Sequence, residues 1–124
     1  MNQLLQQKLV NQFPWVGENF YTECNEGWDR LIWDMVTEID DAYFNLGLES
    51  EIEILQIKEK FGMARVYYWY EYYRSENIGI DDIINKYERA SKTTCELCGE
   101  QGDLIQINTW LAVRCEKCLS GKEY

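Results

Sequence analysis

The sequence predicts an α+β fold in which amphipathic helices pack on a β-hairpin or small antiparallel sheet, followed by a zinc-ribbon-like or treble-clef-like unit with four cysteine ligands. Three observations predict it: a helical apolar stripe over residues 28–43, a β-branched and aromatic run around residues 60–62, and two Cys-x-x-Cys pairs. A chain of 124 residues is long enough for one core. We expect an acidic α+β body over residues 1–91 and a zinc-binding unit over residues 92–124.

Residues 28–44, WDRLIWDMVTEIDDAYF, form the clearest predicted helix. Apolar residues recur there at spacings of three and four, which places one set on a single face: Trp28, Leu31, Ile32, Met35, Val36, Ile39 and Tyr43. Asp34, Glu38 and Asp41 follow the opposite face as an acidic ridge. Similar patterns predict a short helix over residues 2–10 and a helix over residues 80–91, whereas residues 13–27 are expected to be irregular.

Residues 51–73 predict a β-hairpin that turns at Lys60-Phe61-Gly62. Alternation places six side chains on the inner face: Leu55, Ile57, Ala64, Val66, Tyr68 and Tyr70. Ile52 and Ile54 are out of phase with this set, which indicates a bulge or the start of a strand. Tyr67, Trp69 and Tyr73 should point outward, where they are covered by the rest of the chain, anchor a protein partner or stack on nucleic-acid bases.

Four of the five cysteines follow the pattern Cys95-x2-Cys98-x16-Cys115-x2-Cys118, with a candidate hairpin at residues 103–114 between the pairs. Two such pairs at this spacing are typical of a structural Zn²⁺ site, in which four thiolates leave no position for water. Iron in a rubredoxin-like site and a redox-active Cys-x-x-Cys pair are the alternatives. Cys24 stands apart, and we expect a buried, unreactive thiol because Glu23 and Glu26 would raise its pKa.

Negative charge is concentrated in one part of the chain. The net charge is −10, and residues 18–53 alone carry eleven acids against one base. This sign opposes direct binding of nucleic acid. The acidic surface either keeps the protein soluble or binds a basic groove on a protein partner. The candidate partner-binding residues are the acids Asp34, Glu38, Asp40, Asp41, Glu49, Glu51 and Glu53 and the aromatics Tyr67, Trp69 and Tyr73.

The sequence offers no candidate catalytic residue and predicts a protein that is not an enzyme. Because it contains no histidine, the common catalytic triads and the histidine-dependent zinc hydrolases are excluded. A Mg²⁺ site at Asp34, Glu38 and Asp41 is a distant alternative, and no glycine-rich phosphate loop accompanies it. No apolar run reaches the roughly 18 residues of a membrane span. The glutamine-rich start also lacks signal-peptide features, so we expect a location in a reducing cytoplasm.

Three segments, GWDRLIWDMVTEI, QIKEKFGMARVYY and ASKTTCELCG, resemble a group of small proteins of bacteria and their phages. In that group a Gly-Trp-led helix, an Ile-Lys-Glu-Lys-Phe-Gly hairpin and a Cys-x-x-Cys-Gly knuckle come in this order. The resemblance spans residues 27–118, and the chain departs from it in the tyrosine-rich return strand and the density of acids. The chain also resembles phage anti-CRISPR proteins, among them a zinc-containing inhibitor of the Cas9 effector. That resemblance implies a Cas9 inhibitor that acts in the cytoplasm of a host bacterial cell and blocks engagement of target DNA. The alternative is a zinc-stapled interaction adaptor with an unrelated partner.

Overall fold

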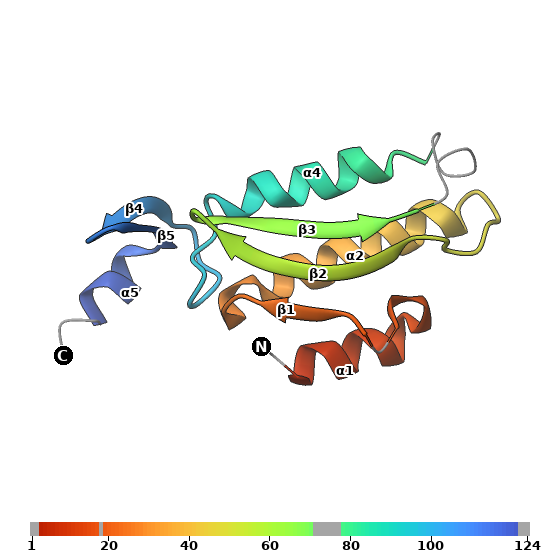
Figure 1. Ribbon diagram of the computed structural model, residues 1–124, viewed down its shortest axis with the longest axis horizontal. Helices are drawn as coiled ribbons and strands as arrows, with labels where there is room; N and C mark the ends of the chain where they lie inside the picture. Colours follow the sequence, from red (N-terminus) through yellow and green to blue (C-terminus); the bar gives the residue numbers. More distant parts are fainter. Residues whose placement is uncertain (1–2, 18, 71–77, 122–124) are drawn as a thin grey trace.

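The computed structural model describes residues 3–17, 19–70 and 78–121 (Figure 1). The elements follow one another as α1 (Gln3–Gln12), the 3-10 helix η1 (Pro14–Val16), β1 (Tyr21–Glu23), the 3-10 helix η2 (Glu26–Trp28), α2 (Asp29–Phe44), β2 (Glu53–Lys60), β3 (Met63–Trp69), α4 (Ile80–Ser91), β4 (Asp103–Ile107), β5 (Trp110–Arg114) and α5 (Glu116–Gly121). One sheet has the order β1-β2-β3, and β4 pairs with β5 in a second sheet. The predicted α+β class is confirmed.

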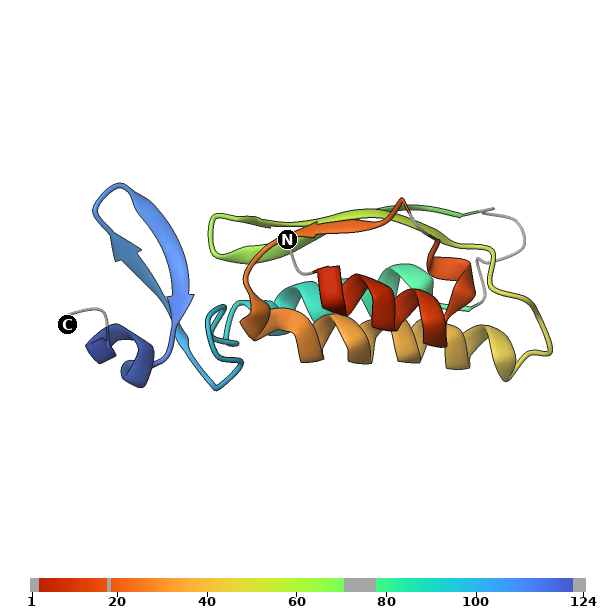
Figure 2. The same cartoon turned by 90° about the horizontal axis from the view of Figure 1, so that it is seen from below.

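Helices α1, α2 and α4 lie on one face of the three-stranded sheet (Figure 2). The core forms between them, and α2 contributes the face that the sequence predicted: Trp28 at its N-cap, Ile32, Met35, Val36, Ile39 and Tyr43 are all buried. Leu31 is only half-buried. Full burial of a side chain such as Ile32 or Met35 stabilises the fold by about 1.5–3 kcal/mol. The buried face of α2 therefore holds much of the body together.

The β2–β3 hairpin turns at Phe61 and Gly62, as predicted, and both residues have positive φ angles of 55° and 80°. Positive φ angles at two consecutive turn residues are typical of a type I′ turn. The pairing register shifts between Ile54 and Gln56, which confirms the predicted bulge. The prediction that Leu55 points inward was wrong. The bulge restarts the alternation, so Ile54 and Ile57 are buried and Leu55 is exposed.

Side chains of α4 cover the outer edge of β3. The backbone N–H of Ala64 donates to Ser91 Oγ at 2.8 Å, and the N–H of Val66 donates to Glu88 Oε2 at 2.9 Å. Tyr68 also donates to Asp81 at the start of α4. An edge strand with satisfied N–H groups cannot readily accept another strand, so α4 both covers the core and protects this edge.

The sequence did not predict strand β1 or helix α5. Strand β1 lies in the segment expected to be irregular and pairs in parallel with β2, with Thr22 opposite Ile57. Helix α5 follows directly after Cys115. Tyr73, one of the predicted outward aromatics, lies outside the described residues. Within the described ranges, every helix is too short or too polar to cross a membrane.

Candidate metal centre

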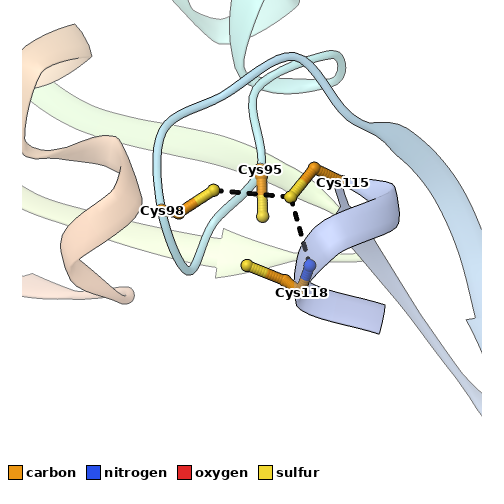
Figure 3. Close-up of side chains that lie close together, drawn as sticks. All are labelled: Cys95, Cys98, Cys115 and Cys118. Atoms are coloured by element: carbon orange, nitrogen blue, oxygen red, sulfur yellow. Dashed lines mark hydrogen bonds between the residues drawn. The ribbon is translucent and has the colours of Figure 1, made fainter. Parts of the chain in front are cut away.

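Four cysteines from both ends of the β4–β5 hairpin converge on one point (Figure 3). Cys95 and Cys98 lie in the turn after α4, Cys115 follows β5, and Cys118 lies in α5. Their Sγ atoms all lie within 4.8 Å of one another, and those of Cys98 and Cys115 are 3.5 Å apart. A tetrahedral ion with metal–sulfur bonds of about 2.3 Å separates its sulfurs by about 3.8 Å. The cluster therefore has the geometry of a four-thiolate metal site.

Backbone hydrogen bonds shape the first cysteine pair. The N–H of Cys95 donates to the Glu100 carbonyl at 2.7 Å, and the N–H of Gly99 donates back to the Cys95 carbonyl at 2.8 Å. Gly99 has a φ of 85°, a conformation that favours glycine. In the second pair, the N–H of Cys118 donates to Cys115 Sγ at 3.3 Å. The turn, hairpin and helix follow one another in treble-clef-like order, the second of the two predicted alternatives.

The thiol pKa values indicate how a bound cation would act on the cluster. Burial raises the pKa of Cys95, but hydrogen bonds from the N–H groups of Cys115, Cys98 and Leu97 outweigh it and lower the value to about 6. The pKa of Cys118 is raised to about 12, chiefly by its contact with Cys115. Without a metal, a thiolate at one cysteine therefore opposes ionisation of its neighbours. A bound cation reverses this effect, because coordinated thiols lose their protons.

The metal centre is docked against the start of α2. The N–H of Gly27 donates to the Glu96 carbonyl at 2.7 Å, and Trp28 Nε1 donates to the Thr94 carbonyl at 2.9 Å. A Cβ atom on Gly27 would lie 2.3 Å from the carbonyl oxygens of both Cys95 and Glu96. Only glycine permits this close approach, so the turn that carries the metal ligands packs directly on the body.

A buried charged pair lies at this junction. Glu96 Oε2 accepts the N–H of Asn25 at 3.1 Å, and Glu96 Oε1 lies 3.6 Å from Arg114 Nη1. Both side chains are less than 8% exposed. Burial raises the pKa of Glu96, against the lowering effect of the Asn25 N–H and Arg114. The guanidinium also lies over the Trp110 ring, 5.7 Å from its centroid. Removal of the charge from Glu96 or from Arg114 would leave the charge of the other side chain buried and uncompensated.

Cys24 lies near this junction and outside the cysteine cluster. It is half-buried, and burial raises its pKa to about 12, with further contributions from the charges of Glu96 and Asp29. The sequence pointed to Glu23 and Glu26 as the responsible acids, whereas distant Glu96 is the main one. At this pKa the thiol is a poor nucleophile at neutral pH.

The predicted acidic ridge is partly used inside the protein. Asp34 pairs with Arg30 at 3.0 Å on the exposed face of α2. Glu38 accepts hydrogen bonds from Lys86 at 2.5 Å and Tyr87 at 2.8 Å, which ties α2 to α4. Asp40 accepts the indole N–H of Trp15 at 2.9 Å. These contacts reduce the freedom of three of the predicted carboxylates to meet a partner.

The other predicted partner residues are more accessible. Asp41, Glu49 and Glu53 are exposed and form no ion pair among the described residues, and Glu51 is half-buried. They lie where α2 ends and β2 begins, at the end of the molecule away from the metal centre (Figure 1). Tyr67 and Trp69 are exposed on β3. The structure thus gathers the acids of the 41–53 region at one end and leaves Asp34 nearer the middle of α2.

The Glu38–Lys86 contact predicts a measurable titration. Chiefly the hydrogen bond from Lys86 lowers the pKa of Glu38 below its ordinary 4.5. A carboxyl with a lowered folded pKa stabilises the fold above its unfolded pKa, and this contribution disappears as pH falls through the folded pKa. We expect Lys86→Met to raise the Glu38 pKa toward 4.5, as followed by NMR of the side-chain carboxyl. The stability change should stay below about 1 kcal/mol because the pair is exposed.

Lys92→Met is the matched control for this titration. Lys92 is exposed at the C-cap of α4 and does not contact Glu38. An unchanged Glu38 pKa in Lys86→Met would contradict the contact between Glu38 and Lys86.

Comparisons of the chain with protein-family models, with curated proteins and with solved structures find no match.

Proposed function

We propose that the metal is Zn²⁺ and that its role is structural. The cluster supplies four thiolates from Cys95, Cys98, Cys115 and Cys118, the ligand set and geometry that zinc takes in closed sites. The β4–β5 hairpin contributes few buried apolar residues, chiefly Ala112 and Val113. A metal that joins the two ends of the hairpin therefore supplies the stability that this small unit lacks.

We further propose that the protein binds and inhibits a basic nucleic-acid enzyme, with Cas9 as the preferred target. The observation that carries this proposal is an uninterrupted acidic region: from Leu31 to Ile57 the chain has seven acids and no base. Its exposed members lie together at one end of the molecule. Cas9 holds its nucleic acids in positively charged channels, and the resemblance to phage anti-CRISPR proteins points to the same target.

The test is a DNA-cleavage assay with purified Cas9 and its guide RNA. We expect the wild-type protein to inhibit cleavage. In the variant that combines Asp41→Lys, Glu49→Lys and Glu53→Lys, association with Cas9 should be slower by about tenfold or more, because charges at the edge of an interface steer the encounter of the two proteins. These three positions are preferable to Glu38, whose replacement by Lys would face Lys86. Added salt should weaken wild-type inhibition, because exposed charges are screened within about 8 Å at physiological ionic strength.

The matched control replaces three exposed acids elsewhere by Lys, namely Asp82, Glu100 and Asp103. It changes the net charge by the same amount as the first triple variant. Full inhibition by the first triple variant would show that the acids only keep the protein soluble. Absence of wild-type inhibition would reject Cas9 as the target. A pull-down that yields a different basic protein would then favour the second candidate, an interaction adaptor, which the exposed Tyr67 and Trp69 also suit.

A further inference from the structure

Two adjacent hollows lie beside the acidic end of the molecule. The first, which we call the Phe44 hollow, has a volume of about 350 Å³ and is lined in part by Trp15, Asp40, Phe44, Leu48 and Glu49. The second, the Trp69 hollow, has a volume of about 380 Å³ and is lined in part by Trp15, Glu51, Glu53, Leu55 and Trp69. Trp15 and Ser50 line both hollows, so together they form one continuous surface.

Exposed apolar side chains line part of this surface, beside polar groups, and one of its aromatic rings is held in place. Phe44 is 76% exposed and Trp69 is 57% exposed, and Leu48 and Leu55 are exposed beside them. The indole of Trp15 is held by its hydrogen bond to Asp40 and by packing against Phe13, with ring centroids 6.5 Å apart. Large aromatic side chains that are fixed before binding are the usual anchors of protein interfaces. The surface therefore has apolar contact area that nothing in the described structure covers.

The rim of both hollows carries charge of one sign. Asp40 and Glu49 line the Phe44 hollow, and Glu51 and Glu53 line the Trp69 hollow; we call these four residues the acidic rim. Among the described residues, no Lys or Arg lines either hollow. Exposed apolar side chains inside a purely acidic rim complement a ligand that combines apolar anchors with positive charge.

The charge also argues against the other occupants. Nucleic acid and anionic lipid surfaces would be repelled by the acidic rim. A second copy of the chain would bring another net charge of −10 and, in a two-fold contact, the same rim. A basic protein segment has neither disadvantage.

We propose that the two hollows together bind a basic protein segment, which inserts apolar side chains beside Phe44 and Trp69 and sets Lys or Arg side chains against the acidic rim. This inference rests on the proposed function of binding a basic partner, and it names the contact: the apolar side chains of the hollows hold the partner and the acids guide it. It joins Trp69 and the acids, which the sequence offered as separate candidate surfaces, into one site. Tyr67 lines neither hollow.

A designed peptide tests this site without knowledge of the natural partner. The probe is a Lys- and Leu-rich amphipathic peptide, and its counterpart replaces each Lys with Glu. We expect the basic peptide alone to shift the NMR signals of the Trp15 and Trp69 indole N–H groups and of the 44–55 backbone in the full chain. Phe44→Ser and Trp69→Ser should each weaken its binding about tenfold by calorimetry, a loss typical of an interface anchor, and Leu48→Ser should weaken it by a smaller factor.

Matched controls replace exposed apolar residues outside the hollows. Phe61→Ser is the counterpart of Phe44→Ser, since Phe61 is 68% exposed at the β2–β3 turn, and Leu46→Ser is the counterpart of Leu48→Ser. Both controls should bind the peptide as the wild type does. Equal weakening in the controls, or no binding of the basic peptide, would overturn the inference. If the wild type forms a dimer and Phe44→Ser abolishes it, the inference is overturned, because the hollows then bind a second copy of the chain.

The Cas9 assay separates this inference from the proposed function. If the wild type binds the peptide in the hollows but does not inhibit Cas9, the Cas9 proposal fails and the site stands. If the Phe44→Ser and Trp69→Ser variants inhibit Cas9 as well as the wild type does, the hollows are not the surface that contacts Cas9, and the inhibitory function stands.

Discussion

Replacement of Cys98 by Ser is expected to remove the metal and unfold the C-terminal unit. Cys98 supplies one of four thiolates, and three remaining ligands would leave an incomplete shell around the ion. Metal binding contributes on the order of 10 kcal/mol to the folding of small zinc units. We expect one zinc per chain in the wild type by metal analysis, little in Cys98→Ser, and a lower thermal transition in the variant. This is the largest effect that the structure predicts.

Cys24→Ser is the matched control, because Cys24 is the cysteine outside the cluster. It should keep one zinc and lose little stability. The body has its own core, with Trp28, Ile32 and Met35 among the buried residues, so the metal-free variant should retain helical circular dichroism. Zinc retained after Cys95→Ser and Cys98→Ser together, or iron found in place of zinc, would contradict the assignment.

Local sequence patterns predicted the elements whose determinants lie close together in the chain. Helix α4 spans Ile80–Ser91, as the apolar stripe indicated, and the β2–β3 turn falls at Phe61-Gly62. In both cases short-range periodicity or turn chemistry fixes the structure. The four metal ligands belong to the same class, because the spacing of two Cys-x-x-Cys pairs is itself the constraint.

Elements that depend on distant partners were not predictable in this way. Strand β1 has three residues, and its partner residues in β2 lie 35 positions further along the chain, as Tyr21 and Gln56 show. Leu55 fits an inward pattern locally, yet the bulge turns it outward. The contacts that engage Glu38 and Asp40 inside the protein have the same origin, since Lys86 and Trp15 reach them only in the folded chain.

The junction between the metal centre and α2 gives the second large prediction. We expect Gly27→Ala to lower the free energy of unfolding by about 2–4 kcal/mol, through overpacking and the weakened Gly27–Glu96 hydrogen bond. The new Cβ would lie 2.3 Å from two backbone carbonyl oxygens, and a side-chain rotation cannot relieve a clash with backbone. For a domain of this size the melting temperature should fall by roughly 10 °C.

The same substitution should also affect the metal, because the carbonyl oxygens that it displaces belong to Cys95 and to Glu96 beside it. We therefore expect a chelator to extract zinc faster from Gly27→Ala than from the wild type.

Gly47→Ala is the matched control. Gly47 has a φ of 69° and no neighbouring atom within 4 Å of a Cβ, so backbone strain alone should cost about 1 kcal/mol. Zinc loss from this control should match the wild type, since Gly47 lies between α2 and β2, far from the centre. If both variants were equally stable and held zinc equally well, the turn that carries Cys95 could not be packed on Gly27. Faster zinc loss in Gly27→Ala alone would show that the body and the metal centre stabilise each other through this contact.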